Sequence, residues 1–252
     1  MKQTDTQLIY GLRPVMEAVK SGKGIDKIFV QSNLQGKLYL ELKNMIAQSE
    51  ETISVQYVPA EKLDRLTGKQ NHQGVAAQLS LIEYHDIEQI ITQTKQKGEA
   101  LFLLMLDSIT DVRNLGAIAR SAECAGVHAL ILPRQATAPV NQDAVRTSAG
   151  ALLRLPVCRI DNPKTFLNLL KSYSITTYVA SEKAQEDYTS MKAEEDLMII
   201  MGNEEKGVNP QIVKQADRLV KIPVKGSIES LNVSVAAGIM MYEVVRQREK
   251  GL

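Results

Sequence analysis

The stretch LFLLML, Leu101–Leu106, is an uninterrupted apolar run that stops at Asp107. Its length fits a strand, and apolar residues at every position are typical of a strand buried on both faces of a sheet. Small residues then recur between Ala117 and Ala125, where they permit close helix packing, and Gly126 can end that helix. The stretch therefore predicts a strand followed by a helix, the repeating unit of an α/β domain with a mostly parallel sheet.

The same alternation continues toward the C-terminus. Further strands are expected at 129–132, 176–180, 197–201 and 219–222, and helices at 144–153, 163–171 and 210–216. In such sheets ligands usually bind at the carboxyl ends of the strands. Three polar loops fall at these ends: 107–114, 202–208 and 223–232.

The N-terminal part of the chain reads as a second, smaller α/β domain over residues 1–82. Its pattern predicts helices at 11–20 and 38–48, and strands at 25–30, 53–58 and 75–79. Residues 83–97 are polar and rich in Gln, Thr and Lys, so they are expected to form a linker that carries a helix. The larger domain then spans residues 98–252.

Composition limits the class of protein. A chain of 252 residues that is 44% hydrophobic can bury a core, and a formal charge of +1 argues against a generic polyanion binder. The N-terminus lacks a signal peptide and no apolar run approaches the roughly 20 residues of a membrane helix, so we expect a cytoplasmic protein. Cys124 and Cys158 lie in apolar segments and are expected to be buried thiols, and three scattered histidines predict no metal site.

Two nucleotide-binding motifs can be excluded. Gly202 and Gly207 are spaced as in a phosphate-binding P-loop, but Val208 and Asn209 occupy the positions of its lysine and serine or threonine. No Gly-x-Gly-x-x-Gly follows a predicted strand either. The chain therefore needs a different kind of ligand site.

Taken together, the three loops resemble the signature motifs of the SpoU (TrmH-like) branch of the SPOUT RNA methyltransferases. The matching stretches are LDSITDVRNLGAIARSA (106–122), IMGNEEKG (200–207), and Ile222-Pro223 through SLNVS (230–234), in the family's order. The resemblance covers about 99–247 and includes RTSAGA (146–151). Near the N-terminus, Tyr10-Gly11 and HQGV (72–75) resemble the L30e-like RNA-binding domain of the family's ribosomal-RNA 2'-O-methyltransferases.

The resemblance implies a deep trefoil knot in the C-terminal domain, an S-adenosylmethionine pocket and a homodimer that binds RNA where its subunits meet. Gly202, Ile222 and Leu231 would frame the cofactor. The reaction centre would be formed by five polar residues: Asn114, Arg120, Glu204, Ser230 and Asn232. Many members have Gly where this chain has Glu205, which gives a bulkier and more acidic loop.

Each of these residues also has a structural interpretation. Asn114 could cap its helix, Arg120 could pair with Glu204, and Glu204 could serve to orient Asn114 or Arg120. Ser230 and Asn232 could cap the last helix, whose core stripe would be Val233, Ala237, Met240 and Val244; Arg246 and Arg248 would form its solvated end, and His72 would be structural. A guanidinium normally stays charged, so Arg120 is equally a candidate for proton acceptor or for a group that binds phosphate and the developing alkoxide.

The expected activity is S-adenosylmethionine-dependent methylation of a ribose 2'-hydroxyl in structured RNA, with a guanosine of 23S ribosomal RNA as the favoured target. The extra N-terminal domain favours this target over tRNA, and a non-catalytic RNA-binding or ribosome-assembly factor is the other alternative. Because the net charge is near zero, RNA contacts should be concentrated on a few residues. The candidates are Arg113, Arg120, Arg134, Arg146 and Arg154.

Overall fold

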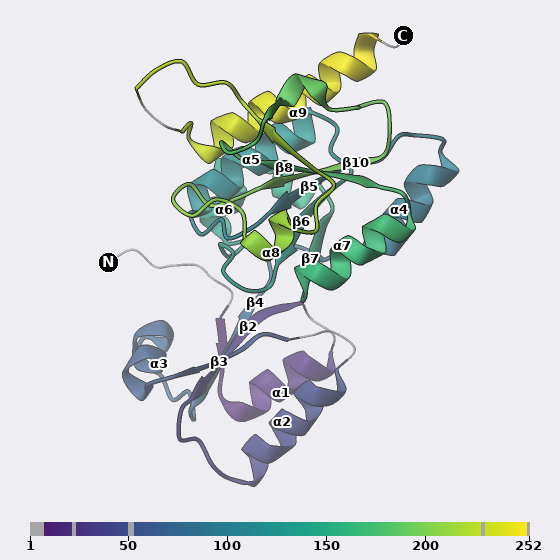
Figure 1. Cartoon of the computed structure of the whole chain (residues 1–252). Helices are drawn as coiled ribbons and strands as arrows, with labels where there is room; N and C mark the ends of the chain where they lie inside the picture. The colour runs from purple at the N-terminus through teal and green to yellow at the C-terminus, as the bar shows by residue number, and fades with distance from the viewer. Residues whose placement is uncertain (1–7, 22–23, 50–52, 228–229, 251–252) are drawn as a thin grey trace. The chain divides into compact units, whose positions relative to one another are not determined.

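The computed structural model describes residues 8–21, 24–49, 53–227 and 230–250, and the chain forms two compact units (Figure 1). The N-terminal unit spans Met1–Glu83 and the C-terminal unit spans Tyr84–Leu252. The predicted linker therefore belongs to the C-terminal unit from Tyr84 onward. It contains helix α4 (Ile87–Gln96), whose Ile91 is fully buried in the core; its polar composition hides this short apolar stripe.

The N-terminal unit is a four-stranded sheet in the order β1-β4-β2-β3. Its strands are β1 (Leu8–Tyr10), β2 (Ile25–Gln31), β3 (Val55–Val58) and β4 (Val75–Leu79), and its helices are α1 (Leu12–Lys20), α2 (Lys37–Gln48) and α3 (Ala60–Thr67). Helices α1 and α2 pack together over one face. His72 joins its loop to α3 by a contact with Asp64, as the structural interpretation of this residue expects.

The C-terminal unit contains a seven-stranded sheet in the order β7-β6-β5-β10-β8-β11-β9, and every pairing in it is parallel. The strands are β5 (Phe102–Leu106), β6 (Ala129–Pro133), β7 (Val157–Ile160), β8 (Thr176–Ala180), β9 (Glu186–Asp187), β10 (Leu197–Met201) and β11 (Arg218–Lys221). Strands β7 and β9 lie outside the predicted strands: β7 carries an arginine and follows a proline, and β9 has only two exposed residues.

Helices cover both faces of this sheet (Figure 1). One layer contains α4, α7 (Pro163–Ser172) and α8 (Pro210–Val213), which pack on alternate residues of β5 and β10 such as Leu103 and Met198. The other layer contains α5 (Val112–Cys124), α6 (Gln142–Thr147) and α9 (Val233–Lys250), with α5 packed against both neighbours. Burial on both faces explains why the strand-forming run at 101–106 is continuously apolar.

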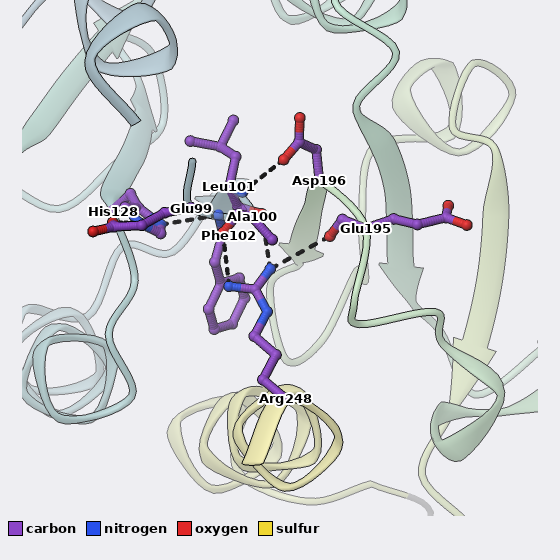
Figure 2. A network of polar contacts seen from close by, with 8 residues as sticks. All are labelled: Glu99, Ala100, Leu101, Phe102, His128, Glu195, Asp196 and Arg248. Atoms are coloured by element: carbon purple, nitrogen blue, oxygen red, sulfur yellow. Dashed lines mark hydrogen bonds and ion pairs between the residues drawn. The ribbon is translucent and has the colours of Figure 1, made fainter. Parts of the chain in front are cut away.

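Helix α9 is fixed at its C-terminal end by Arg248 (Figure 2). The guanidinium donates hydrogen bonds of 2.8–3.0 Å to the carbonyls of Ala193, Ala100 and Leu101, and it lies over the Phe102 ring. Burial lowers the pKa of Arg248 from its usual value. The expectation of a solvated helix end is therefore wrong for Arg248, because the amino ends of β5 and β10 leave carbonyls that need donors.

Arg246 is more exposed but pairs with the buried carboxylate of Glu243, 2.6 Å away. The predicted core stripe of α9, formed by Val233, Ala237, Met240 and Val244, is confirmed, since all four are at most 5% exposed.

No helix within the described residues is both long and apolar enough to cross a membrane. The same part of the chain also contains no cluster of His, Cys, Asp or Glu able to hold a metal ion.

Candidate functional site

The three polar loops meet at the carboxyl ends of the central strands. β5 ends at Leu106 and β10 at Met201, and these two residues are direct partners in the parallel ladder. Strand β8 lies between β10 and β11, so the residues that follow β10 and β11 flank the end of β8. The sequence prediction that the loops share one edge of the sheet is confirmed by this register.

Glu204 joins all three loops through one carboxylate oxygen. Its Oε1 accepts hydrogen bonds from Asn114 Nδ2 at 3.3 Å, from Asn232 Nδ2 at 2.5 Å and from the backbone N–H of Val233 at 3.0 Å. Asn232 Nδ2 also donates to Asn114 Oδ1 at 3.1 Å. Glu204 therefore orients Asn114, as one interpretation expects, and not Arg120; none of its described contacts is an ion pair with that arginine.

Asn232 also caps α9. Its Oδ1 accepts the backbone N–H and the hydroxyl of Ser234, so one side chain both starts the helix and reaches the cluster. Glu204 adds an anionic acceptor at the first N–H of the same helix, which the helix dipole favours. Capping and site formation are thus two effects of one arrangement.

The start of α5 differs from the expectation. Asp111, not Asn114, is the N-cap: its carboxylate accepts the N–H groups of Arg113 and Asn114. Asn114 lies inside the first turn, which leaves its side chain available for Glu204. The sequence carried the signal for this, because an aspartate precedes the first helical residue at Val112.

The three predicted cofactor residues occupy different environments. Gly202 is buried at the end of β10, Ile222 is half-buried just after β11, and Leu231 is 39% exposed immediately before Asn232. Val224 is also exposed, at 45%. Exposed aliphatic side chains of this kind offer apolar contact to a flat ring.

The loop after β10 is tightly closed. Asn203 and Gly207 exchange backbone hydrogen bonds of 3.1 and 2.8 Å, and a Cβ atom on Gly202 would lie 2.3 Å from the backbone of Gly207 and Val208. Glycine is therefore required at Gly202 for the loop to close. The side chain of Asn203 holds the loop further by accepting the N–H groups of Glu205 and Lys206.

Five arginines were predicted to contact RNA, and they differ in their pairing. Arg134 is half-buried against Asp161 at 2.8 Å, while Arg146 and Arg154 are exposed but lie 2.7 Å and 3.7 Å from Asp143 and Glu123, respectively. Arg113 and Arg120 are exposed on α5, about two turns apart and hence on one face. Within the described chain, these two side chains form no hydrogen bond or ion pair.

Ser230 and Cys124 are both exposed. Ser230 is described and exposed, but among the described residues its side chain bonds to no member of the cluster. Cys124 is exposed and Cys158 is buried, so the expectation of two buried thiols is wrong for Cys124. Cys124 is the last residue of α5, where the apolar pattern no longer faces the core.

Comparisons with known proteins agree with this geometry. Residues 101–242 match the model of the SpoU rRNA methylase family, and residues 8–85 match the model described as RNA 2'-O ribose methyltransferase substrate binding. A Bacillus subtilis protein assigned to the TrmH family of tRNA/rRNA methyltransferases, YacO, is 33% identical over 243 residues, which are 95% of each chain.

Two solved structures have a similar fold. The SpoU methyltransferase AviRb from Streptomyces viridochromogenes in complex with the cofactor AdoMet is 25% identical, with a TM-score of 0.60, and the match covers 96% of this chain and 90% of that one. The TrmH/SpoU tRNA modifying enzyme of A. aeolicus is 26% identical, with a TM-score of 0.56, but it matches only 64% of this chain and 85% of its own.

The residues present fit S-adenosylmethionine. Ile222, Val224 and Leu231 offer apolar surface for an adenine, and the irregular loops after β10 and β11 offer backbone polar groups. Leu231 directly precedes Asn232 of the Glu204 cluster, and Ile222 and Val224 follow β11, so all of these groups belong to loops at the same edge of the sheet. When bound, the cofactor supplies an electrophilic methyl group on a sulfonium.

The parallel sheet, the three loops joined by Glu204 and the two matching family models, which together span most of the chain, agree on one assignment. The chain belongs to the SpoU (TrmH) family of S-adenosylmethionine-dependent RNA methyltransferases.

Proposed function

We propose that this enzyme methylates a ribose 2'-hydroxyl, and that its target is a guanosine of 23S ribosomal RNA. The observation that carries the proposal is the hydrogen-bonded set Asn114–Glu204–Asn232, which unites three loops far apart in the sequence beside an apolar cofactor surface. The match of residues 8–85 to a 2'-O ribose methyltransferase substrate-binding model supports the ribose as acceptor.

Ribosomal RNA is favoured over tRNA by the N-terminal unit. The solved tRNA modifying enzyme matches 64% of this chain, whereas AviRb matches 96%. The extra unit therefore accompanies relatives other than that tRNA enzyme, and it would add shape recognition of a structured RNA.

In the proposed mechanism, alignment of the methyl donor with the acceptor oxygen contributes most of the rate acceleration. Transfer to the 2'-oxygen is an in-line displacement, so the acceptor must be held opposite the sulfonium. Arg113 and Arg120 are exposed and without described partners, which suits binding of RNA phosphates. We assign Arg120 to the target phosphate and to the negative charge that develops on the acceptor oxygen, while solvent water takes the proton.

The Glu204 cluster would hold the site in place. Because Oε1 of Glu204 already accepts three hydrogen bonds, this oxygen is committed to structure. Asn232 is fixed both by Glu204 and by its capping bonds, so the start of α9 is held against the loop after β10.

A homodimer is also proposed. Val235 and Tyr242 are each 51% exposed and lie about two turns apart on one face of α9, beginning near Leu231. Apolar groups repeated on an exposed helix face fit a second copy of the chain. Light scattering after chromatography should give the mass of a dimer, and Tyr242→Glu should shift it toward the monomer; a wild-type monomer would contradict the proposal.

The substrate is tested by methyl transfer. The purified chain is incubated with tritiated S-adenosylmethionine and with either 23S ribosomal RNA or bulk tRNA. We expect label in the ribosomal RNA alone, and mapping of 2'-O-methyl sites should place the label on one guanosine. Label on tRNA or on a base would refute the proposed substrate. Cofactor binding without transfer to any RNA would instead favour a non-catalytic binding factor.

A further inference from the structure

Asp107 is a buried carboxylate at the carboxyl end of β5, and the described contacts tie it to the end of β10. It is only 5% exposed, and its backbone N–H donates to Met201 O at 2.8 Å. Its Oδ2 accepts the backbone N–H of Asn209 at 2.7 Å, and its Oδ1 accepts the hydroxyl of Ser108 at 3.3 Å. The residue therefore contacts both the strand before the 202–208 loop and the residue directly after that loop.

A second tether reinforces the first. Asn203 Nδ2 donates to the carbonyl of Ser108 at 3.2 Å, while Asn203 Oδ1 accepts two N–H groups of its own loop. Ser108 has a φ of 59°, which a non-glycine residue rarely adopts, so the chain turns sharply to present this carbonyl. The loop is thus fixed to residues 107–108 near its start, by Asn203, and at its end, by Asn209.

We propose that Asp107 is a positioning residue for the cofactor. It acts through the Asn209 N–H to hold the loop that carries Gly202 and Glu204, and it contacts neither cofactor nor RNA itself. The inference rests on the S-adenosylmethionine pocket that the proposed function also uses, and it is independent of which RNA is methylated.

The choice of side chain follows from hydrogen-bond chemistry. A buried N–H without an acceptor is costly, and an ionised acceptor forms a stronger bond than a neutral one. Alanine at position 107 removes the acceptor of Asn209 altogether. Asparagine keeps a neutral acceptor of the same size, so it should restore part of the effect.

The test measures cofactor binding by calorimetry on the full chain. Asp107→Ala should raise the Kd of S-adenosylmethionine on the order of tenfold, and Asp107→Asn should recover part of the loss. In methyl transfer the KM for the cofactor should rise by a larger factor than kcat falls, while the KM for RNA stays within about twofold of wild type.

Asp196 provides the matched control. It too accepts a backbone N–H at 2.7 Å, that of Leu101, but at the amino ends of the strands (Figure 2). Asp196→Ala should lower the unfolding temperature and leave the Kd of S-adenosylmethionine within about twofold of wild type. Equal weakening by the Asp196 and Asp107 variants would overturn the inference, because the effect would then be general destabilisation.

Three further outcomes are decisive. If Asp107→Ala does not fold, two other variants replace it: Asp107→Asn weakens the hydrogen bond to Asn209, and Asn203→Ala removes the hydrogen bond to Ser108. Unchanged cofactor binding in both variants would overturn the inference. A wild-type chain that binds no S-adenosylmethionine would overturn the proposed cofactor chemistry itself. Wild-type binding with an unaffected Asp107→Ala would overturn only the role of Asp107.

Discussion

Arg120 and Glu204 have different tasks at the scale of single residues. Arg120 is exposed and without a described partner, while Glu204 is bonded to Asn114, Asn232 and the backbone of Val233. A side chain without a partner is available to a substrate, whereas one that already accepts three hydrogen bonds holds its neighbours in place. We therefore propose that Arg120 serves RNA binding and that Glu204 maintains the geometry of the pocket.

The pH dependence of catalysis tests the role of Arg120. Wild type and Arg120→Ala should give pH–rate profiles of the same shape, with the variant slower on the order of 100-fold at every pH, because an interaction with the transition state is lost and no proton acceptor is. Profiles of kcat/KM for RNA provide the measurement. If the wild-type rate rises with pH and this rise is absent in the variant, Arg120 takes the proton.

Glu204 and Glu205 form a matched pair for mutation. Glu204→Gln keeps the size but removes the charge that strengthens three hydrogen bonds, so kcat should fall on the order of tenfold or more. Glu205 lies next to it on the exposed part of the loop, and Glu205→Gln should leave kcat within about twofold of wild type. Steady-state methyl transfer with both variants decides this, and equal losses would argue against the specific role of Glu204.

The two cysteines should differ in reactivity. Burial raises the pKa of Cys158 to about 12, whereas Cys124 is exposed. At about pH 8 a disulfide reagent should label one thiol in the native chain and two in denaturant. Because its pKa is raised, the buried Cys158 thiol contributes to the free energy of unfolding at pH values below 9.0, the usual thiol pKa. This contribution is lost as the pH rises toward about 12. Rapid native labelling of Cys158 would contradict its burial.

At the scale of elements, the site depends on how tightly the loop after β10 closes and on where α9 begins. A Cβ atom on Gly202 would lie 2.3 Å from the backbone of Gly207 and Val208, and α9 starts on an N–H bound by Glu204. Helix α9 is also fixed at its other end by Arg248. Loop and helix are therefore held as rigid parts, which favours accurate alignment.

A pair of glycine variants separates loop closure from overall stability. Gly202→Ala places a Cβ atom 2.3 Å from the backbone of Gly207 and Val208, so the loop must move. The Kd of S-adenosylmethionine should therefore rise by about tenfold or more. Gly116→Ala meets the Thr147 side chain at 2.6 Å and Ala144 O at 2.9 Å, between α5 and α6. It should lower the unfolding temperature while the Kd measured by calorimetry changes little. Unaltered binding in Gly202→Ala would show that the loop tolerates opening.

At the scale of the whole molecule, the cofactor residues and the RNA-contacting arginines assigned here all lie in the C-terminal unit. The N-terminal unit has its own sheet and its own apolar clusters, and it matches a separate substrate-binding model. We therefore assign cofactor binding to the C-terminal unit alone, and we propose that both units contribute to RNA binding.

Hydrogen exchange should show this division. In the absence of RNA, S-adenosylmethionine should slow exchange in peptides that contain 107–115, 202–209 and 230–236, because binding favours closed loops. Peptides from 8–83 should exchange as in the free chain. Mass spectrometry of both states gives the measurement, and equal protection of the N-terminal unit would contradict the prediction.

The sequence by itself determined the alternation of strands and helices, the two-part organisation and the three loops at the strand ends. These features follow from local periodicity: LFLLML predicts a strand wherever it lies, and strand β8 and the core stripe of α9 were predicted at their observed positions. It also determined the family, because motif residues and their order are properties of the sequence.

Only the tertiary structure decided which side chain does what. The contacts of Glu204 with Asn114 and Asn232 join residues 90 and 28 positions apart, and those of Asp107 with Asn209 and of Arg248 with Ala100 span 102 and 148. The burial of α4 in the core was likewise decided by the tertiary structure. Local patterns encode burial and periodicity, but partner choice depends on which distant backbone groups the fold brings within hydrogen-bond distance.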